Sequence, residues 1–452
     1  MLNFTKVDRN NPSKRGVMER ITDFKEVYNV FDKHKAREQA ERCIGCGDPY
    51  CHNKCPLHNI IPAWLKQTAS KDLELAFNIS NETSPFPEIL GRICPQDVLC
   101  EGDCTLNETH GAVTIGAVET HISETGFDKG LTPKFSSKKI GKKVAIIGSG
   151  PAGISAATFL LREGVDVDMF ERAPTAGGLL TYGIPGFKLD KHRVQRRIDW
   201  LVEAGMTLHT NCEIGRDKSF EELENSYDAV FLGIGATKGR KPGIDGENND
   251  NVYLAMDFLS AIQRRNFNES VENFIDVKDK NVVVIGGGDT AMDCLRTSVR
   301  EGAKSVKCLY RRDQANMPGS KKEVVNSKEE GVHFIFNVSP KSIDQNGVNV
   351  VTTQMTAPDE TGRQSVKINE GSDYIEQADI IIMALGFEQE VPSFLATANL
   401  ELDKWNGIKT NDKHQTSNAK IYAGGDGVRG ADLAVRAAAD GKAAAKAIVN
   451  SF

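Results

Sequence analysis

The sequence lacks the features that direct a chain into a membrane, onto nucleic acid or out of the cell. Its longest apolar runs, such as residues 380–385, are far shorter than the roughly 20 residues that cross a bilayer. The formal net charge of −6 gives nucleic acid and anionic lipid no electrostatic reason to bind. The first residues carry charges where a secretory signal has an apolar core. We therefore expect a cytoplasmic protein without a membrane or nucleic-acid partner.

The 452 residues, 39% of them hydrophobic, are enough for about two to three ordinary globular domains.

Cysteine is sparse except in one early stretch. Seven of the 10 cysteines lie between residues 43 and 104. In a reducing compartment such a cluster indicates metal ligation rather than disulfide bonds.

The early cysteines follow spacings typical of iron–sulfur proteins. The run Cys43-x2-Cys46-x4-Cys51-x3-Cys55-Pro56 is similar to that of bacterial ferredoxins, in which the cysteine before proline reaches a second cluster. The gap between its second and third cysteines is longer than in that run. A further group, Cys94-Pro-x4-Cys100-x3-Cys104, adds three thiolates.

Two iron–sulfur clusters account for these cysteines better than zinc does. Clustered cysteines often hold zinc, but thiolates interleaved with Cys-Pro dipeptides favour two 4Fe–4S clusters. Two such clusters need about eight ligands, one more than the seven cysteines supply. His52 and His58 are candidates for the missing ligand, although a histidine near such a site is more often a packing residue.

A glycine fingerprint for dinucleotide binding follows a short apolar strand. The strand Val144–Ile147 runs into Gly148-x-Gly150-x-x-Gly153 and then into a predicted helix over residues 154–163. The first glycine permits a tight turn, the second lets the backbone approach a pyrophosphate, and the third lets the helix pack on the strand. Alone the motif is equally consistent with a glycine-rich turn. The next strand, 165–170, ends in Glu171, which is placed to accept hydrogen bonds from a ribose.

A second fingerprint follows the strand that starts at Val282. It contains Gly286 and Gly288, and Ala291 replaces the third glycine. The next strand, 305–310, ends in Arg311-Arg312 instead of an acid. A carboxylate repels the 2′-phosphate of NADPH, whereas arginine pairs with it. The first fingerprint is therefore predicted to bind FAD and the second NADPH; a surface basic pair is the alternative interpretation of the arginines.

Strands alternate with helices from residue 142 onward, which predicts doubly wound parallel sheets. Residues 330–377 indicate a small antiparallel addition, including strands over 332–338 and 347–353. Gly425 and Asp426 end a late strand before an alanine-rich helix, a position suited to a flavin ribityl chain. The predicted fold is α/β, with a helical iron–sulfur domain over 1–140, an FAD-binding domain over 141–255 and 391–452, and an NADPH-binding domain over 256–390.

With these motifs the whole chain resembles the family of small (beta) subunits of NADPH-dependent glutamate synthase. The motifs that carry the resemblance are Cys43-Ile-Gly-Cys46, Cys55-Pro-Leu-His-Asn-Ile-Ile-Pro62, Arg92-Ile-Cys94-Pro and Leu180-Thr-Tyr-Gly-Ile-Pro-Gly-Phe-Lys-Leu189. The electron-input part of dihydropyrimidine dehydrogenase is similar in the same places. In that wider family a polar side chain supplies the missing cluster ligand, from a segment that corresponds here to residues 115–119.

The resemblance implies an electron-input subunit in a hetero-oligomer. Hydride would pass from NADPH to FAD, and electrons would leave through two 4Fe–4S clusters to a large (alpha) subunit that makes glutamate from glutamine and 2-oxoglutarate. One cluster would lie on Cys43, Cys46, Cys51 and Cys104, and the other on Cys55, Cys94, Cys100 and Glu119. We expect FAD at Gly148, Gly150, Gly153, Glu171, Gly178, Leu179, Lys188, Ile214, Gly425 and Asp426. We expect NADPH at Gly286, Gly288, Asp289, Thr290, Arg311, Arg312 and Gly386.

Three other functions share part of this pattern. A flavin disulfide reductase would carry a C-x4-C pair soon after the first fingerprint, whereas Cys212 stands alone. An NADPH-dependent oxidoreductase with another acceptor, such as ferredoxin or a pyrimidine-reducing partner, has the same scaffold and differs only in its partner. The third is a non-enzymatic nucleotide sensor with a zinc-bound interaction module, which analysis for iron and acid-labile sulfide would distinguish.

Overall fold

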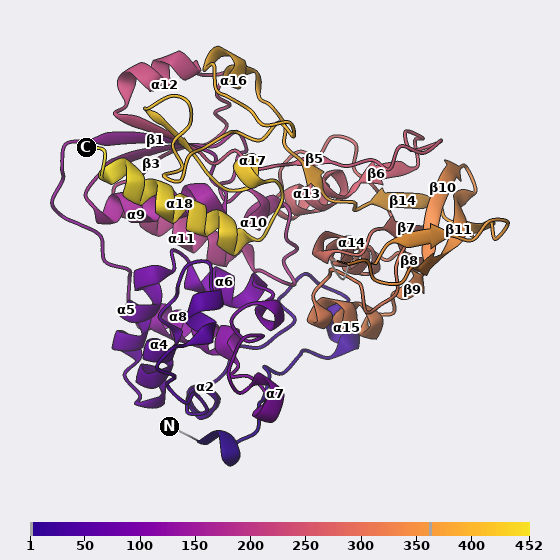
Figure 1. The fold of residues 1–452 in the computed structure, drawn as a ribbon, viewed down its shortest axis with the longest axis horizontal. Helices are drawn as coiled ribbons and strands as arrows, with labels where there is room; N and C mark the ends of the chain where they lie inside the picture. The colour runs from indigo at the N-terminus through magenta and orange to yellow at the C-terminus, as the bar shows by residue number, and fades with distance from the viewer. Residues whose placement is uncertain (1–2, 361–363) are drawn as a thin grey trace.

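The computed structural model describes residues 3–360 and 364–452 as a helical N-terminal region and two α/β domains (Figure 1). Two helices of the helical region begin at aspartate caps: the Asp32 carboxylate accepts from two backbone amides and the Asp72 carboxylate from one. Its core is built around Trp64 and Phe77, which are both fully buried. The helices are α1 (Val17–Arg20), α2 (Lys33–Ala40), α3 (Tyr50–Lys54), α4 (Ile61–Ala69), α5 (Leu73–Thr83), α6 (Pro87–Ile93), α7 (Asn107–His110) and α8 (Ile115–Asp128).

The first α/β domain is a parallel sheet in the order β16-β4-β1-β2-β3. Helices α9 (Pro151–Arg162) and α18 (Ala434–Val449) cross closely on this sheet. They can do so because Gly441 of α18 has no side chain: a Cβ added to it would lie 2.1 Å from the carbonyl oxygen of Ala152 in α9. The strands are β1 (Lys143–Ile147), β2 (Asp166–Phe170), β3 (Thr207–His209), β4 (Ala229–Leu232) and β16 (Ile421–Ala423). The helices are α9 (Pro151–Arg162), α10 (Leu179–Tyr182), α11 (Lys191–Glu203), α12 (Phe220–Ser226), α16 (Ser393–Thr397), α17 (Asp426–Arg429) and α18 (Ala434–Val449).

The second α/β domain is another parallel sheet, in the order β6-β14-β7-β8-β9. Its strands are β6 (Val252–Leu254), β7 (Asn281–Ile285), β8 (Ser305–Tyr310), β9 (His333–Phe336) and β14 (Ile380–Met383). Its helices are α13 (Ala255–Asn266), α14 (Asp289–Arg300) and α15 (Lys321–Glu329). These two domains confirm the predicted α/β fold class.

An antiparallel sheet extends the second domain. It consists of β10 (Val338–Asp344), β11 (Gly347–Met355), β12 (Val366–Ile368) and β13 (Tyr374–Gln377). The sequence indicated one antiparallel strand over residues 332–338, but β9 pairs in parallel with β8 and only β10 turns into the antiparallel sheet. The positive φ of Asn337, between the two strands, makes this change of direction possible.

The chain crosses between the two α/β domains twice. The crossing segments pair as the short antiparallel strands β5 (Lys238–Gly239) and β15 (Phe387–Glu388). Strand β6 already belongs to the second sheet, so the first crossing comes earlier than the predicted boundary at residue 255. A strand this short gives little local sign of which of two similar sheets it joins.

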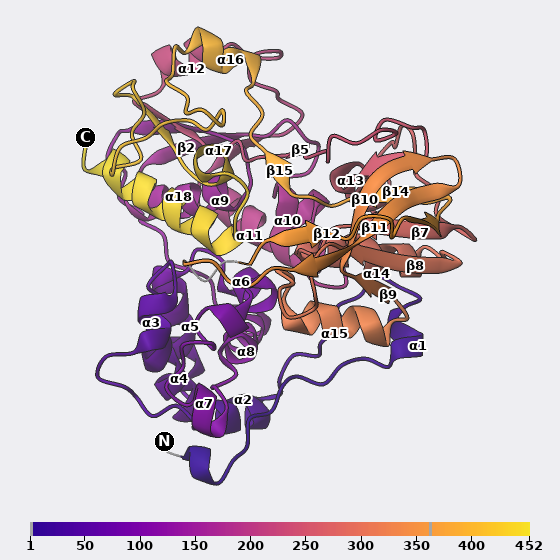
Figure 2. The ribbon, with the colours of Figure 1, turned by 45° about the vertical axis from the view of Figure 1, so that its right-hand side comes forward.

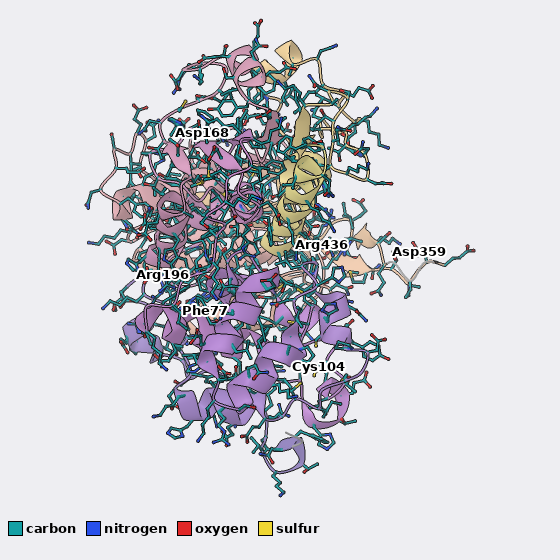
Figure 3. All side chains as sticks on the ribbon, turned by 90° about the vertical axis from the view of Figure 1, so that its left-hand side faces the viewer. Phe77, Cys104, Asp168, Arg196, Asp359 and Arg436 are labelled. Atoms are coloured by element: carbon teal, nitrogen blue, oxygen red, sulfur yellow. The ribbon has the colours of Figure 1, made fainter. Side chains whose placement is uncertain are left out.

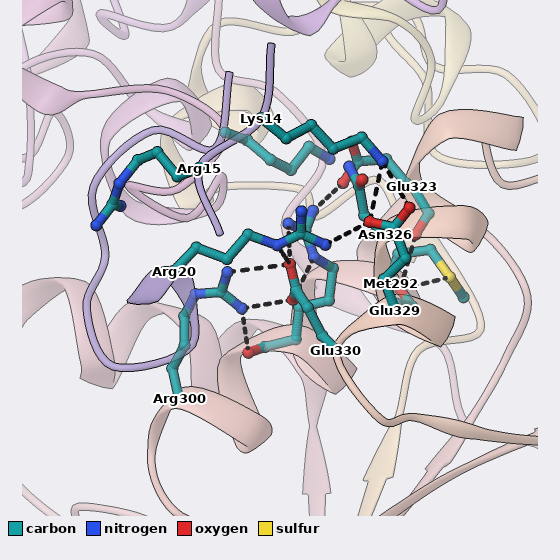
Figure 4. A network of polar contacts seen from close by, with 12 residues as sticks. Lys14, Arg15, Arg20, Met292, Arg300, Glu323, Asn326, Glu329 and Glu330 are labelled. Carbon is teal, nitrogen blue, oxygen red and sulfur yellow. Dashed lines mark hydrogen bonds and ion pairs between the residues drawn. The ribbon is translucent and has the colours of Figure 1, made fainter. Parts of the chain in front are cut away.

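An extended segment, the N-terminal strap (residues 13–31), lies along the second α/β domain (Figure 2). The Arg20 side chain, 1% exposed, donates to Glu330 and Glu329, and Phe24 packs into the second domain's core. Arg300 also pairs with Glu330, and Figure 4 shows this network of polar contacts.

The helical region also packs directly against the first α/β domain. Arg197 of α11 and Glu88 of α6 form an ion pair of 2.6 Å with both side chains fully buried. The Arg196 guanidinium lies 3.7 Å from the ring centroid of Phe127 and pairs with Glu124. Figure 3 shows Phe77 and Arg196 near this boundary, with Cys104 farther into the helical region.

Among the described residues no helix combines the length and apolar character needed to span a bilayer.

Candidate functional site

The first fingerprint has two glycines that the protein's own packing requires and one that faces open space. Gly148 has φ +98°, and an added Cβ would lie 2.4 Å from the Gly233 carbonyl oxygen. At Gly153 the Cβ would lie 2.0 Å from the Gly148 oxygen. Nothing lies within 4 Å of a Cβ added to Gly150. The room needed for a pyrophosphate is therefore at the second glycine, as the fingerprint predicts.

Glu171 stands at the end of β2 and is already bound to the fingerprint turn. Its Oε2 accepts from the Ser149 amide at 3.1 Å and from the Ser149 hydroxyl, and its Oε1 accepts from the Ala173 amide at 2.8 Å. The carboxylate thus ties the strand end to the turn. An ionised carboxylate has about four acceptor sites, so lone pairs are left for a ribose hydroxyl.

A cavity of about 730 Å³ runs between the two α/β domains and is lined by both fingerprints. From the predicted FAD set it includes Gly148, Gly150, Glu171, Gly178, Leu179, Lys188, Ile214, Gly425 and Asp426. From the predicted NADPH set it includes Asp289, Thr290 and Gly386. The lining does not include five of the predicted residues: Gly153 of the FAD set, and Gly286, Gly288, Arg311 and Arg312 of the NADPH set. The size suits a cofactor site that is largely pre-formed.

Asp426 lies where α17 begins, beside the first residues of α18. Burial raises the pKa of its carboxyl to about 7, and the backbone amide of Asp432 donates to it at 3.3 Å. The neighbouring Gly425 amide donates to Asp440, which Arg429 also binds. Ala434 and Val435, at the N-terminus of α18, line the same cavity. A partly desolvated carboxyl facing a cavity is well placed to bond a polyhydroxyl chain.

The second fingerprint repeats the turn of the first with a different third residue. Gly286 has φ +143°, and its added Cβ would lie 2.2 Å from the Ala384 oxygen, whereas nothing lies within 4 Å of one at Gly288. Ala291 is fully buried, so this helix and strand leave room for a methyl group. The Asp289 carboxylate accepts from the Ser320 amide at 3.0 Å.

Arg311 and Arg312 follow β8 with fixed backbones, and within the described parts of the chain their side chains have no ion-pair partner. The Arg311 carbonyl accepts from the Thr353 hydroxyl and the Arg312 carbonyl from the Asn337 amide. Within residues 3–360 and 364–452 neither guanidinium has a carboxylate within ion-pair distance. The Nε of Arg312 is buried without a hydrogen-bond partner in the same residues. Unpaired donors at this strand end fit a phosphate group.

The cysteines of the helical region fall into two groups, and within each group neighbouring thiols raise one another's pKa. Burial, together with the nearby Cys104, Cys43 and Cys46, raises the pKa of the Cys51 thiol to about 12. Burial also raises the pKa of Cys94, where the neighbours are Cys55 and Glu119, and that of Cys100, where they are Glu101, Cys55, Cys94 and Glu119. Thiols that oppose each other's ionisation become ligands when a cationic group binds among them.

Glu119 of α8 lies beside three of these cysteines. A small cavity is lined by Cys55, Cys94, Cys100 and Glu119. Burial raises the pKa of Glu119 to about 8, and the Asn59 amide donates to its Oε1 at 2.7 Å. His52 and His58 are absent from that lining, and the His52 ring contacts the Asn59 carbonyl at 3.1 Å. The donor set therefore fits a cluster with one carboxylate ligand better than one with a histidine.

The same side chains are less suited to a single zinc ion. Zinc draws four ligands to about 2.0–2.3 Å from one point. In the described parts of the chain, no three His, Cys, Asp or Glu side chains converge in that way. The thiolates of a 4Fe–4S cluster bind separate irons and do not need to meet at one point.

Sequence reasoning missed two residues that contact the predicted ligand residues. Asn59 holds Glu119, and its place in the motif Cys55-Pro-Leu-His-Asn-Ile-Ile-Pro62 was the available signal. Asp293 lies 2.9 Å from Lys188 and lines the nucleotide cavity. Its position four residues after Asp289 on the same helix was the available signal, because residues at i and i+4 share a helix face.

Comparison with protein families matches two parts of the chain. Residues 142–441 match the model described as pyridine nucleotide-disulphide oxidoreductase. Residues 20–131 match the model described as dihydropyrimidine dehydrogenase domain II, 4Fe-4S cluster. These matches divide the chain where the helical region gives way to the first sheet.

Curated relatives cover the chain from end to end. The glutamate synthase (NADPH) small chain of Escherichia coli is 47% identical over 99% of this chain and 98% of its own. The protein of that name from Azospirillum brasilense is 44% identical over 99% and 95%. The putative oxidoreductase AegA of Escherichia coli is 45% identical over 98% of this chain but only 69% of its own. Among solved structures, FprA of Mycobacterium tuberculosis in complex with NADPH shares the fold, with a TM-score of 0.58, 20% identity and coverage of 68% and 84%.

Proposed function

This chain belongs to the family of NADPH-dependent glutamate synthase small chains, and from that premise we propose that it is the electron-input subunit of such an enzyme. It is an oxidoreductase of the pyridine nucleotide-disulphide type with a 4Fe–4S domain. When bound, NADPH and FAD supply two-electron chemistry, and two 4Fe–4S clusters supply one-electron transfer to a large subunit that forms glutamate from glutamine and 2-oxoglutarate. The proposal includes a hetero-oligomer in the cytoplasm.

One observation carries the proposal: Cys94 borders both the nucleotide cavity and the small cysteine cavity. Val435, near the start of α18, also lines both. The lining of the nucleotide cavity includes Cys94 and none of Cys43, Cys46, Cys51 and Cys104, which supports placing the group of Cys55, Cys94, Cys100 and Glu119 nearer to the nucleotides. This order supports a direction for electrons, from the nucleotides through the inner group and outward through the group that contains Cys104.

The chain's own residues have distinct roles in this proposal. Gly148, Gly150 and Glu171 hold the FAD phosphates and ribose, and Asp426 bonds the ribityl chain. Gly286 and Gly288 receive the NADPH pyrophosphate, and Arg311 and Arg312 pair with the 2′-phosphate. Asn59 fixes the Glu119 carboxylate so that it faces the cysteines rather than solvent. The limits of the domains stay part of the proposal, with the first crossing placed before Val252.

The cofactor content is tested on protein purified without oxygen. We expect one FAD and about eight irons with matching acid-labile sulfide. Zinc without sulfide would contradict the cluster assignment. NADPH is expected to bleach the flavin much faster than NADH, because only NADPH reaches Arg311 and Arg312 with a phosphate.

The direction of electron flow is tested by Cys94→Ser. The variant should keep FAD and its reduction by NADPH but fail to support glutamate formation when a large subunit, glutamine and 2-oxoglutarate are added. Cys212→Ser is the matched control, since Cys212 lines the nucleotide cavity but belongs to neither cysteine group. Normal glutamate formation by the Cys94 variant would contradict the proposed route.

A second function is favoured by the relatives named putative oxidoreductases. AegA and UacF of Escherichia coli align with 98% of this chain, yet the alignments cover only 69% and 72% of those proteins. The same scaffold is thus combined with other segments, and this chain could serve an acceptor other than a glutamate-forming subunit. Reduction of ferredoxin by NADPH, without glutamate formation with any large subunit, would favour that function.

A further inference from the structure

A buried ion pair joins the two nucleotide-binding domains at the wall of their shared cavity. Lys188 follows α10 in the first domain, and Asp293 lies on α14 of the second. The Lys188 ammonium is 2.9 Å from Asp293 Oδ1, and the two side chains are 13% and 8% exposed. Both residues line the cavity to which both fingerprints contribute. Through this pair, the Asp293 carboxylate of the second domain acts directly on the charge of Lys188 in the first domain.

The charges around Lys188 keep it protonated. Burial alone would lower the pKa of Lys188, but Asp293, Glu323 and Asp289 together raise it above its usual value. Glu323 is bound by Arg296, and the Asp289 carboxylate accepts from the Ser320 amide. Asp293 is thus the carboxylate in direct contact with the ammonium. The other two carboxylates, Glu323 and Asp289, also act on the Lys188 ammonium and favour its charged form.

The ion pair is not needed to fasten the loop that carries Lys188. The neighbouring Phe187 is 1% exposed, and its ring lies 4.4 Å from the Arg296 guanidinium and 4.0 Å from that of Arg300. Phe24 of the N-terminal strap stacks on the same ring at 6.3 Å. Replacing a buried ion pair by well-packed hydrophobic residues of similar volume is often neutral or stabilising. If the pair only stabilised the fold, its position in the wall of the nucleotide cavity would have no explanation.

We propose that Asp293 is a positioning residue that holds the Lys188 ammonium at the flavin and sets the net charge there. The inference rests on the proposed function. Reduction of FAD by NADPH moves a hydride, two electrons and one proton, from the nicotinamide to the flavin. One C–H bond breaks, one N–H bond forms, NADP+ is produced and the reduced flavin gains one negative charge. The positive charge of Lys188 stabilises the negative charge of the reduced flavin, and the negative charge of Asp293 partly offsets the positive charge of Lys188.

The proposal predicts opposite effects from the two halves of the pair. Lys188→Gln removes a positive charge and should disfavour reduced flavin, whereas Asp293→Asn leaves Lys188 uncompensated and should favour it. Each change is expected to shift the equilibrium between NADPH and the flavin by about tenfold, which is roughly 30 mV for a two-electron couple. The double variant removes both charges and should return close to the wild-type potential.

The experiment is an anaerobic titration of the flavin midpoint potential in the full chain. Glu376→Gln is the matched control, because Glu376 pairs with Lys307 at 2.8 Å in the second domain away from the cavity. It should leave the potential unchanged. Opposite shifts for Lys188→Gln and Asp293→Asn support the proposal, and equal or absent shifts overturn it.

Two further variants keep the test decisive if Asp293→Asn fails to fold. Asp293→Glu and Lys188→Arg preserve the charges and should keep the potential near wild type, while Lys188→Gln still lowers it. A Lys188→Gln potential equal to wild type would then overturn the inference. Absence of FAD from the wild-type protein would instead contradict the proposed function, so the two failures are distinguishable.

Discussion

The two nucleotide-binding domains share a strand–turn–helix design and differ in the side chains placed at the end of the next strand. In the first domain the acid Glu171 is bound by the Ser149 and Ala173 amides. In the second, Arg311 and Arg312 have fixed backbones and side chains without an ion-pair partner among the described residues. In the proposed function the backbone of each turn provides a general site for a dinucleotide, and the side chains at the strand end select which one binds.

The two domains also differ in how they are fastened to the helical region. The first is held by the fully buried pair Arg197–Glu88 and by apolar packing across the same boundary. The second is held by the N-terminal strap, through a network in which Arg20, Arg296 and Arg300 all pair with Glu330 (Figure 4). Of these pairs only Arg20–Glu330 crosses from the strap to the second domain, and the packing of Phe24 into that domain's core adds an apolar contact.

The largest expected effect comes from Glu330→Gln. Burial alone would raise the pKa of Glu330, but Arg296 and Arg300 lower it to about 2. Removing one member of a buried ionic network costs about 3–5 kcal/mol. The depressed pKa means that the stabilisation is present above the unfolded pKa of about 4.3 and is lost as pH falls toward 2. Thermal unfolding at pH 7 and pH 3 should show a deficit that shrinks at the lower pH.

The neighbouring Glu329 provides the control for that experiment. It pairs with Arg20 at 2.7 Å and Lys14 at 2.9 Å, but its side chain is 37% exposed. Exposed pairs contribute about 0–1 kcal/mol, so Glu329→Gln should change stability little. If both variants lost the same stability, the network's buried part would not be what holds the second domain.

A smaller effect is expected from the double variant Arg311→Gln, Arg312→Gln. Hydrogen bonds to charged groups contribute about 1.5–3 kcal/mol, so the preference for NADPH over NADH should fall by about 10- to 100-fold. The ratio of kcat/KM for the two nucleotides measures it. Arg216→Gln, an exposed arginine of the first domain that pairs with Asp217, should leave the ratio unchanged. An equal fall in both rates would contradict the phosphate role.

Gly153→Ala tests the turn of the first fingerprint. The added methyl group would lie 2.0 Å from the Gly148 carbonyl oxygen, so α9 must move away from the strand. Overpacking of this kind costs about 1–3 kcal/mol. We expect a lower melting temperature and less FAD per protein, measured by absorbance after gel filtration. Full FAD occupancy at wild-type stability would show that the helix moves without cost.

Ala291→Gly makes the reverse exchange in the second fingerprint and should have the smallest effect. Ala291 is fully buried on α14, and no contact requires glycine there. Glycine in a helix costs about 1 kcal/mol relative to alanine, with little change in KM for NADPH. A large loss of NADPH binding would mean that the two turns are less alike than their backbones indicate.

Local patterns predicted much of the fold. The observed strands Lys143–Ile147 and Ser305–Tyr310 follow the predicted bounds within a residue, because each is mostly apolar and is followed directly by glycine or by charged residues. Strand β9 was placed in the wrong sheet, since alternation along a strand does not reveal which neighbour it pairs with. The burial of Arg42, which donates to the carbonyls of His110, Gly111 and Ala112, was likewise invisible.

The sequence by itself determined the two nucleotide fingerprints, because a tight turn, a phosphate approach and a helix contact each require a small residue at a fixed spacing. It also determined the cysteine-rich character of the helical region. Only the tertiary structure brought Cys104 to Cys51, Glu119 to Cys94, and Lys188 to Asp293. Those contacts join residues that are not neighbours in the chain, and their partners are set by how helices pack within the helical region or how the two α/β domains meet, rather than by any local preference.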